Sequence, residues 1–333
     1  MDGNMLILTA DDVRRALPMK EAITAMKDAY ASLSDGTAVA PLRTRLPIPG
    51  SDALSLFMPA YVNSRNGKAL AIKAVSLFPT NPARGLAYIQ AAVLAFDPQT
   101  GRAMALLEGS SLTAIRTGAA GGAAIELLAR ADSKVAAIFG AGAQGRTQLE
   151  AACTVRNIES VFIFDSDPDK AKTFAQEMAG RGRIPKKIQV ATSSKEAVEN
   201  ADIICTATTS TKPVFDDKDL KAGTHISAVG SYTPDMQEVP TETVRRAKVV
   251  VDSRAASLEE AGDLIQPIRA GIFDESHIHA ELGEIVLGRK PGRNTQHEIT
   301  YFKSVGIAVQ DAMAAQIALD HARTMNIGRE VEF

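Results

Sequence analysis

Three closely spaced glycines are the residues of this chain whose arrangement points most directly to a chemistry. They stand in the run Gly140-Ala141-Gly142-Ala143-Gln144-Gly145. Between a strand and a helix, the first glycine allows a tight turn, the second lets a pyrophosphate approach the backbone, and the third lets the helix pack closely on the strand. The start of that helix offers unpaired N–H groups and a partial positive charge to the phosphates. The run therefore predicts a dinucleotide-binding loop, and the alternative is a glycine-rich turn without a ligand.

An acidic residue stands where such a loop needs one. Asp165 lies 20 positions beyond Gly145, at the end of the next strand-like run. Its carboxylate is expected to accept hydrogen bonds from the adenosine ribose hydroxyls, and its charge repels a 2′-phosphate. This favours NAD over NADP as the cofactor, although Arg146 and Lys170 lie close enough in the sequence to soften the preference.

Two later strand-like runs end in small or uncharged residues. Ligands of open parallel sheets bind beyond the carboxyl ends of the strands, and small side chains there leave room for the ribose and nicotinamide of a dinucleotide. The residues expected to line this part of the cofactor site are Thr206, Ala207, Thr208, Val229, Gly230 and Ser231. The alternative is that they are ordinary loop residues.

Four basic residues lie in or beside apolar segments of the first 116 residues, namely Arg43, Arg45, Lys73 and Arg116. Lys73 interrupts the apolar run 69–75, where a lysine is costly unless it reaches water, a partner or a ligand. Cations with few acids near them in sequence suit an anionic substrate group such as a carboxylate. Lys73 is also a candidate proton donor or polarising group for a C=N or C=O bond, because a buried lysine loses basicity readily. The alternative for each residue is an exposed or salt-bridged position.

Alternating strand-like and helix-like segments place the glycine run within a fold. Strands are expected at 134–139, 160–165, 187–191, 201–205, 225–229 and 248–251, and helices at 144–155 and 169–178. Such alternation implies parallel strands with crossover helices. The expected fold class is α/β, with a Rossmann-type doubly wound parallel sheet in residues 119–306.

The beginning of the chain has a different pattern. A helix from Thr9 to about Gly36 precedes apolar runs at 54–62, 69–78, 87–96 and 102–107. The segment 97–101 contains the Pro and Gly of a chain reversal, so the last two runs are expected to form a hairpin. Strands without helices between them indicate a second, α+β domain in residues 1–118, to which a helix at 307–323 is expected to return.

The composition excludes several classes of protein. Of 333 residues, 45% are hydrophobic and 23% are charged, as in a globular rather than a disordered chain. The 37 Lys and Arg residues against 39 Asp and Glu residues give a net charge of −2, which argues against nucleic-acid binding. No apolar stretch reaches the roughly 18 residues of a membrane span, and the N-terminus lacks a signal-peptide pattern, so a cytoplasmic location is expected.

Cysteine and histidine spacing predicts no metal site. Cys153 and Cys205 lack CxxC spacing, and His277 and His279 have no third ligand nearby at a plausible distance in sequence. A disulfide framework is excluded by the cysteine count, and the histidines are expected to lie in loops or at the surface.

Several stretches together resemble the ornithine cyclodeaminase/mu-crystallin family, which includes archaeal-type alanine dehydrogenases and ketimine reductases. The resemblance spans nearly the whole chain. Besides the glycine run it rests on residues 41–44, 57–61, 72–73, 112–120, 228–230, 281–285 and 299–311. The Arg-Thr-Gly-Ala-Ala stretch from Arg116 and the final segment are quite specific in combination.

The resemblance implies a homodimer with a dinucleotide domain in 119–306 and a substrate-binding and dimerisation domain in 1–118 and 307–333. It also implies that Arg43, Lys73 and Arg116 hold a substrate carboxylate. The preceding proline favours Arg43 over Arg45 in the alignment, and a short gap leaves this choice open. Three residues of the matching stretches are assigned to the cofactor as well, namely Thr117, Ser304 and Gly306.

One residue departs from the family pattern. Members with cyclodeaminase or alanine dehydrogenase activity carry an aspartate two residues before the proline that corresponds to Pro234, and this chain has Tyr232 there. Cyclodeamination needs a base near the amine, and tyrosine, with its high ordinary pKa, is a poor replacement. Asp235 lies on the other side of the proline, so which of the two residues replaces the aspartate stays open.

We therefore expect an NAD(P)H-dependent reductase of small cyclic α-imino acids, such as pyrroline-2-carboxylate or piperideine-2-carboxylate, that yields an L-amino acid. Lys73 would supply the proton while Arg43 and Arg116 grip the carboxylate. The alternatives are an ornithine cyclodeaminase with recycled NAD and an alanine dehydrogenase. A non-catalytic binding protein that keeps the fold and the nucleotide is a further alternative.

Overall fold

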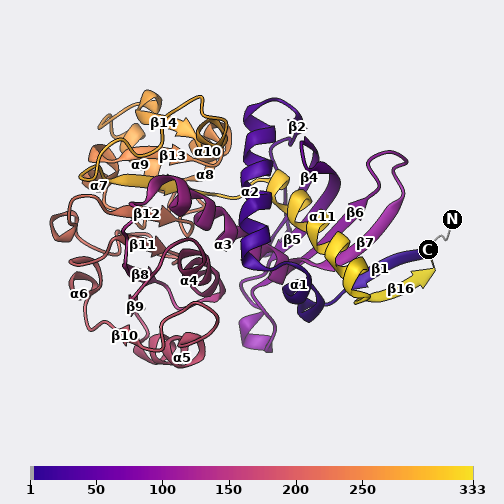
Figure 1. Cartoon of the computed structure of the whole chain (residues 1–333), viewed down its shortest axis with the longest axis horizontal. Coiled ribbons are helices and arrows are strands. Elements are labelled where there is room, and N and C mark those ends of the chain that lie inside the picture. Colours follow the sequence, from indigo (N-terminus) through magenta and orange to yellow (C-terminus); the bar gives the residue numbers. More distant parts are fainter. Residues whose placement is uncertain (1–3, 333) are drawn as a thin grey trace. The chain divides into compact units, whose positions relative to one another are not determined.

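The computed structural model describes residues 4–332 (Figure 1). The chain divides into two compact units, of which unit 1 consists of Met1–Arg116 and Ile307–Phe333 and unit 2 of Thr117–Gly306. The first boundary thus falls inside one long helix, two residues before the 118/119 boundary predicted from the sequence.

Unit 1 is built on a mostly antiparallel sheet. Its strands are β1 (Asn4–Leu8), β2 (Ala38–Val39), β3 (Thr44–Pro47), β4 (Leu54–Ser64), β5 (Gly67–Leu77), β6 (Ile89–Phe96), β7 (Ala103–Glu108) and β16 (Arg329–Glu332). Their order in the sheet is β16-β1-β7-β6-β5-β4-β2, with β3 paired to β4. β6 and β7 pair antiparallel across the segment 97–101, so the predicted hairpin is confirmed.

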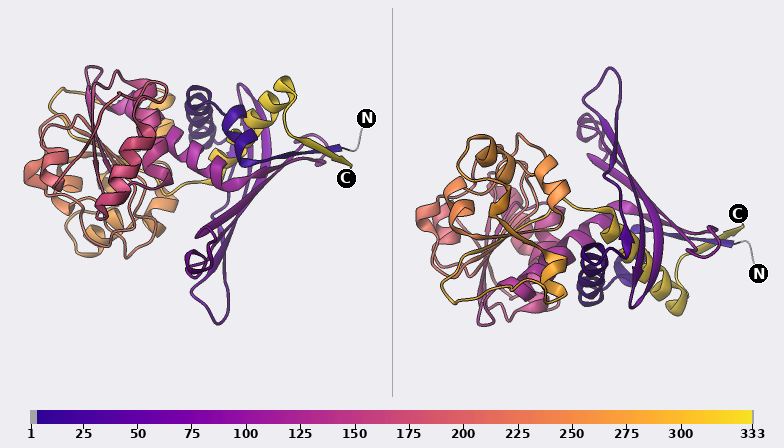
Figure 2. Two further views of the ribbon diagram at one scale, coloured as in Figure 1. Left: turned by 90° about the horizontal axis from the view of Figure 1, so that it is seen from below. Right: turned by 90° about the horizontal axis from the view of Figure 1, so that it is seen from above.

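Helices cover one face of this sheet. Unit 1 contains α1 (Ala10–Ala16), α2 (Met19–Ser34), the 3₁₀ turn η1 (Pro82–Arg84), the start of α3 (Gly109–Leu128) and α11 (Ala308–Met325). Both α2 and α11 pack on β4, and α11 also packs on β5, from the same side of the sheet (Figure 2). Alternate residues of β5 face these helices and are buried, namely Ala69, Ala71, Lys73 and Val75. Lys73 therefore points into the helix-covered side of the sheet.

The start of the chain differs from the sequence prediction in two ways. The single helix expected from Thr9 to Gly36 is two helices, because Pro18 lacks an N–H and clashes with a preceding helical turn. The predicted helix start is confirmed, since the Thr9 side chain accepts from the Asp12 N–H in a capping box. Strand β1 was not expected, and it pairs parallel with β7 at the edge of the apolar runs.

Unit 2 is a doubly wound parallel sheet, which confirms the α/β, Rossmann-type fold class. Its strands are β8 (Val135–Phe139), β9 (Ser160–Phe164), β10 (Ile188–Val190), β11 (Ile203–Thr206), β12 (His225–Ala228), β13 (Lys248–Val251), β14 (Ile278–Glu281) and β15 (Thr300–Lys303). Their order is β10-β9-β8-β11-β12-β15-β13-β14, and every described pair is parallel. The order reverses between β8 and β11, the point at which ligands bind in sheets of this kind.

The sequence predicted six of these strands and missed β14 and β15. β15 lies in the middle of the sheet, between β12 and β13. Its four residues follow a polar loop, and a run this short carries no readable periodicity.

The helices of unit 2 connect its strands. They are α4 (Ala143–Val155), α5 (Pro168–Met178), α6 (Ser194–Val198), α7 (Thr241–Arg246), α8 (Arg254–Glu260), α9 (Gly262–Arg269) and α10 (Leu282–Val286), with 3₁₀ turns η2 (Asp217–Asp219) and η3 (Glu275–His277). Helix α4 packs on β8 and β11, and α5 packs on β9 and β10.

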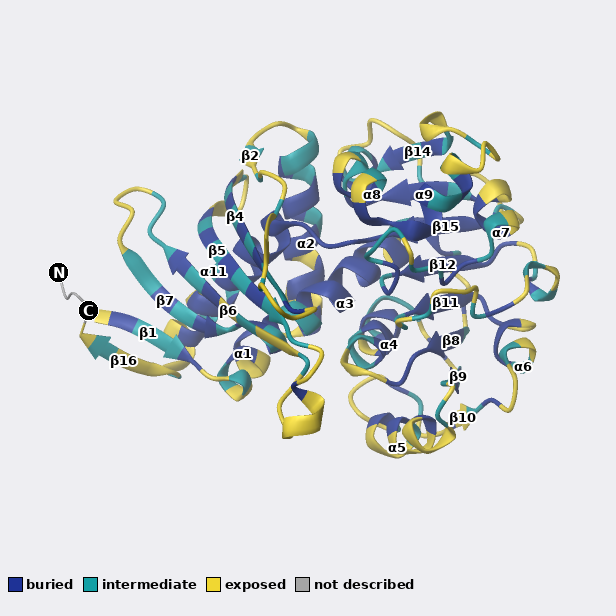
Figure 3. Cartoon of the chain, turned by 180° about the vertical axis from the view of Figure 1, so that it is seen from behind, coloured by how far each residue is buried: buried dark blue, intermediate teal, exposed yellow. Residues whose placement is uncertain are grey.

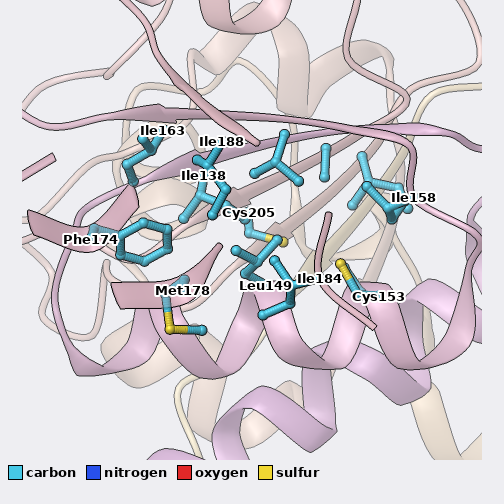
Figure 4. Packing of buried hydrophobic residues seen from close by; sticks show 14 of the residues in the cluster. Ile138, Leu149, Cys153, Ile158, Ile163, Phe174, Met178, Ile184, Ile188 and Cys205 are labelled. Atoms are coloured by element: carbon cyan, nitrogen blue, oxygen red, sulfur yellow. The ribbon is translucent and has the colours of Figure 1, made fainter. Parts of the chain in front are cut away.

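Apolar side chains from these elements form a continuous core in unit 2 (Figure 4). Leu149 of α4 and Phe174 of α5 pack there against Ile138 of β8. Cys153 and Cys205 belong to this core as free thiols, and burial raises the pKa of each to about 12. Both cysteines are therefore inert packing residues.

Within residues 4–332, no helix combines the length and the apolar character needed to cross a membrane.

Candidate functional site

Two of the predicted cations of unit 1 meet on one carboxylate. Nζ of Lys73 lies 2.7 Å from Oδ2 of Asp311, and Nε of Arg116 donates to Oδ1 of the same residue at 2.9 Å. Lys73 comes from β5, Arg116 from α3 and Asp311 from the first turn of α11. We call these three residues the cation cluster.

The cation cluster is almost fully buried. Lys73 is 2% exposed, Arg116 5% and Asp311 1%. Burial, with the nearby charge of Arg116, lowers the pKa of Lys73 to about 7, although Asp311 opposes the shift. Burial alone would raise the pKa of Asp311, but the charges of Arg116 and Lys73 outweigh it and leave that pKa lowered. Lys73 is therefore able to exchange a proton near neutral pH beside an ionised Asp311.

Helix α11 also orients the Arg116 guanidinium through a second residue. Nη1 of Arg116 donates to Oε1 of Gln310 at 2.9 Å, and the N–H of Ile307 donates to the same oxygen at 2.9 Å. Nε2 of Gln310 donates to the hydroxyl of Tyr30 on α2. Arg116 is thus fixed by two neighbouring residues of one helix turn.

The remaining two predicted cations lie on and before β3. Arg43 is half-buried, and its charge contributes to the lowered pKa of Lys73. Arg45 is exposed within β3, opposite Leu56 of β4. The structure therefore places Arg43, rather than Arg45, under the electrostatic influence of the cation cluster.

Sequence reasoning missed Asp311 and Gln310. Both are buried in the first turn of α11, and both contact Arg116. The signal available in the sequence is a pair of polar residues at the start of an otherwise Ala-rich helix. This signal is weak, because Asp and Gln in a first helical turn are ordinarily capping residues that face solvent.

In unit 2, the glycine run has the geometry of a close-packed turn. Gly140 has φ of +99°, and a Cβ there would lie 2.5 Å from the carbonyl oxygen of Ala207. A Cβ on Gly145 would collide with the Gly140 carbonyl, whereas nothing lies within 4 Å of one on Gly142. Two glycines are thus required by the packing of the loop, and Gly142 leaves open space outside it.

The start of α4 fits an anionic group. Gly142 is its N-cap and offers no side-chain acceptor, so no side chain caps the first-turn N–H groups, which include those of Ala143 and Gln144. Gly142 and Ala143 are exposed and Gln144 is half-buried. Backbone donors at the N-terminus of a 13-residue helix, with space beside them, suit the pyrophosphate of a dinucleotide.

Asp165 follows β9 and already bonds to the backbone around it. Its Oδ2 accepts from the N–H of Ala141 at 2.8 Å, and its Oδ1 accepts from the N–H of Asp167 at 2.9 Å. Of the two nearby cations, Arg146 bonds to the loop carbonyls and to Glu177, and Lys170 lies 3.7 Å from Asp167. Asp165 is half-buried beside the glycine run, and both cations have acidic partners.

The loops after β11 and β12 are close-packed. Thr206 is fully buried, whereas Ala207, Thr208 and Val229 are half-buried. Gly230 and Ser231 are buried, and the Ser231 hydroxyl donates to the Met236 carbonyl at 2.9 Å.

The other residues assigned to the cofactor are held inside unit 2. The carbonyl of Thr117 accepts from Nε2 of Gln148 at 3.0 Å. Oδ2 of the buried Asp252 accepts from the Ser304 hydroxyl at 2.8 Å and from the Gly306 N–H at 2.8 Å. All of these residues are buried.

The candidates for the missing family aspartate differ in exposure. Tyr232 is half-buried and Asp235 is exposed. Neither His277 nor His279 points to a metal, because Nε2 of each lies within hydrogen-bond distance of a backbone carbonyl, at 2.8 and 3.0 Å. Among residues 4–332 no three His, Cys, Asp or Glu side chains are grouped as a metal ion requires.

A doubly wound unit with a glycine loop, in one chain with a buried cation cluster, defines the class of dinucleotide-dependent oxidoreductases. The chain belongs to the ornithine cyclodeaminase/mu-crystallin family, whose model matches residues 4–326.

Three similar proteins cover essentially the full chain. The Delta(1)-pyrroline-2-carboxylate reductase of Bacillus cereus is 42% identical over 330 residues, which are 99% of this chain and 100% of that protein. The Thermococcus litoralis reductase of the same name, solved with NADH and L-proline, is 46% identical with a TM-score of 0.93, over 98% of this chain and 100% of that one. An archaeal alanine dehydrogenase dimer with bound NAD is 33% identical with a TM-score of 0.90, over 99% of each chain.

Proposed function

We propose that this protein is an NAD(H)-dependent reductase of small cyclic α-imino acids of the pyrroline-2-carboxylate type, and that it forms L-amino acids. The observation that carries the proposal is the buried cation cluster, in which Lys73 and Arg116 outnumber Asp311. Its excess positive charge suits a substrate carboxylate. Full-length similarity to two proteins named Delta(1)-pyrroline-2-carboxylate reductase supports this substrate class.

Arg116 and Arg43 would bind the substrate carboxylate. Arg116 uses Nε and Nη1 for Asp311 and Gln310, which leaves Nη2 for the ligand. Because the guanidinium is held by two bonds before the substrate arrives, binding costs it little side-chain entropy. Arg43, in the segment before β3, would bind the same carboxylate.

Lys73 would supply the proton of the reaction. When bound, NADH supplies a hydride to the imine carbon, and the C=N double bond becomes a single bond. Nζ of Lys73 donates a proton to the imine nitrogen, which completes the amino acid. Asp311 would stabilise the protonated form of Lys73 before the proton is transferred. Its ion pair with Nζ at 2.7 Å would also fix the orientation of the ammonium group.

Unit 2 would hold the dinucleotide. The glycine loop and the N-terminus of α4, with Gly140, Gly142, Ala143 and Gln144, suit the pyrophosphate. Asp165 suits the adenosine ribose, and its charge favours NAD over NADP. The nicotinamide half would lie against the residues at the later strand ends, namely Thr206, Ala207, Thr208, Val229, Gly230, Ser231, Ser304 and Gly306, with Thr117 near them.

We also propose that the protein is a homodimer joined through unit 1. The sheet face opposite α2 and α11 carries half-buried apolar side chains such as Phe57, Pro59 and Ile72. Figure 3 shows that the ribbons of β4 and β5 contain segments of intermediate burial. Leu42, before β3, and Leu46, in β3, are also exposed. Apolar side chains that stay partly exposed on one sheet face are typical of an interface. The cytoplasmic location stays a prediction from the sequence.

Three assays on the purified protein separate the candidate functions. NADH oxidation on addition of pyrroline-2-carboxylate, with stoichiometric L-proline, supports the reductase. Ammonia release from ornithine at constant NADH supports the cyclodeaminase. NADH oxidation that requires pyruvate and ammonia supports an alanine dehydrogenase, and NADH binding without turnover of any of these substrates would contradict all three enzymes and leave the binding protein.

A further inference from the structure

Glu238 is a fully buried carboxylate that joins two loops of unit 2. Its Oε1 accepts from the N–H and the hydroxyl of Thr208, at 2.6 and 2.8 Å. Its Oε2 accepts from the Thr206 hydroxyl at 2.9 Å and from the N–H groups of Gly230 and Ser231 at 2.7 and 3.2 Å. Oε1 thus binds the loop after β11, and Oε2 connects the end of β11 to the loop after β12.

Those two loops approach each other more closely than side chains allow. A Cβ on Gly230 would collide with the Thr208 carbonyl and with Oε1 of Glu238. A Cβ on Gly140 would meet the Ala207 carbonyl, so the glycine loop packs against the same segment. The carboxyl-end loops of β8, β11 and β12 therefore form one stack, and Glu238 is the side chain that bridges two of its layers.

A second tier of charged residues fixes Glu238 itself. Oδ1 of the fully buried Asp263 accepts from the Glu238 N–H at 2.7 Å, and the Asp263 N–H donates to the Ser231 hydroxyl at 3.2 Å. Nζ of Lys303, also fully buried, lies 3.5 Å from Oδ2 of Asp263. We call Glu238, Asp263 and Lys303 the carboxylate cluster. Burial raises the pKa of Glu238, an effect that the Lys303 charge opposes.

We propose that Glu238 is a positioning residue that sets the spacing of the two loops against which the nicotinamide half of the cofactor lies. The inference rests on the proposed dinucleotide site. Glu238 has no exposed surface, so it acts on the cofactor through Thr208 and Gly230 rather than by contact. None of the Glu238 bonds reaches the glycine loop or Asp165, which would hold the adenosine and pyrophosphate half, so that half should respond less to their loss.

The chemistry at this position requires two acceptor oxygens. All five groups around the carboxylate are donors, and three of them are backbone N–H groups that cannot turn away. In Glu238→Gln the NH₂ group would face either the Thr208 N–H or the Gly230 and Ser231 N–H groups. At least one buried backbone donor then loses its acceptor, and the loop that carries it shifts.

The experiment measures the binding of two ligands to Glu238→Gln. NADH contains the nicotinamide half, and ADP contains only the half assigned to the glycine loop. We expect the dissociation constant of NADH to rise about tenfold or more, the size expected for one orphaned buried donor. We expect that of ADP to change less than twofold. Calorimetric titration of both ligands gives the two constants.

Asp202→Asn is the matched control. Asp202 is also buried and accepts from two backbone N–H groups, of Lys134 and Val135, but it lies at the amino ends of the strands. It should lower thermal stability without changing the ratio of NADH to ADP affinity. Thr206→Val removes one hydroxyl donor only and serves if Glu238→Gln does not fold; it should weaken NADH binding in the same direction but less.

The outcomes distinguish this inference from the proposed function. If the unaltered protein binds neither NADH nor ADP, the dinucleotide site itself is wrong. If it binds both, and Glu238→Gln and Thr206→Val weaken both ligands equally or neither, the positioning role is overturned while the reductase proposal stands. Selective loss of NADH affinity in both variants, absent from Asp202→Asn, supports the role.

Discussion

The cation cluster of unit 1 and the carboxylate cluster of unit 2 are both removed from water, and their charges are balanced in opposite ways. Lys73 and Arg116 face the single carboxylate of Asp311. In the carboxylate cluster, the two carboxylates of Glu238 and Asp263 lie near the single ammonium of Lys303, among the residues that the structure describes. Buried charge in excess of its partners is costly, so each cluster needs further compensation.

The compensation differs between the two. The excess negative charge of the carboxylate cluster is met by fixed donors, since Glu238 accepts three backbone N–H bonds and Asp263 accepts two. The cation cluster has acceptors only in Asp311 and Gln310, among the partners seen in residues 4–332. The chain itself satisfies the buried charge of the carboxylate cluster, whereas the cation excess of unit 1 is the charge that we propose a substrate carboxylate neutralises.

Replacing Lys73 is the largest perturbation of this comparison. Lys73→Met keeps the volume in the sheet and removes both the charge and the proton donor. We expect kcat/KM for pyrroline-2-carboxylate to fall by about 10²- to 10⁴-fold, the usual contribution of general acid catalysis. The dissociation constant of NADH, measured by fluorescence titration, should stay nearly unchanged. An equal loss of NADH affinity would contradict the assignment of Lys73 to the substrate.

A lysine of unit 2 provides the control for that substitution. The Lys248 side chain is 10% exposed and forms an ion pair with Glu298 at 2.8 Å. Lys248→Met therefore removes a partly buried ion pair that does not involve the cation cluster. It should leave kcat/KM unchanged. Protein stability distinguishes the two variants further. The pKa of Lys73 is about 7 in the folded protein and 10.5 for an unperturbed lysine, so the unfolded chain binds more protons between these values. The contribution of Lys73 to the free energy of unfolding therefore rises with pH over this range. Lys73→Met abolishes that rise.

Asp311→Asn tests the acidic partner of the cluster. We expect kcat/KM to fall on the order of 10²-fold, because Arg116 and Lys73 lose the carboxylate that orients them. The pH profile carries the sharper signature. Protonated Lys73 is the donor, so imine reduction in the unaltered protein should decline above pH of about 7. Asp311 raises the pKa of Lys73, so Asp311→Asn should move the decline in activity to lower pH. If the decline stays at the same pH, a group other than Lys73 causes it.

The sequence identified those residues of the candidate site whose types are unexpected in their local pattern. Lys73 was found because it interrupts an apolar run, and the glycine loop because its spacing has a backbone reason. Asp311 and Glu238 were not found, because a carboxylate in a first helical turn or a polar loop is ordinary there. Only the tertiary fold shows that both are buried.

The helices and strands likewise could be predicted where the local sequence has a clear pattern, and not elsewhere. Runs with clear periodicity, such as β5 and α4, were predicted within two residues. The four-residue strand β15 is set by its neighbours β12 and β13 rather than by its own pattern, so no local signal identified it.

Asp165→Ala gives a smaller effect, confined to unit 2. The change removes the acceptor for the Ala141 N–H and the charge proposed to repel a 2′-phosphate. We expect KM for NADH to rise about tenfold, in line with the loss of a charged acceptor, and the preference for NADH over NADPH to narrow. Steady-state kinetics with both cofactors measure the ratio. Unchanged discrimination between the cofactors would remove Asp165 from the ribose site.

Tyr301→Phe should have the smallest effect on activity, and it tests whether the carboxylate cluster is structural beyond Glu238. The Tyr301 hydroxyl donates to Oδ2 of the buried Asp263 at 3.1 Å, two steps from the loops that face the cofactor. Its removal should lower the free energy of unfolding by about 1–2 kcal/mol, since a buried acceptor loses one partner. Thermal unfolding measures this loss. Because two backbone N–H groups still bond to Oδ1 of Asp263 and Lys303 still lies 3.5 Å from Oδ2, kcat and KM for NADH should stay within about twofold. A kinetic loss larger than the stability loss would mean that the whole cluster, and not Glu238 alone, positions the loops.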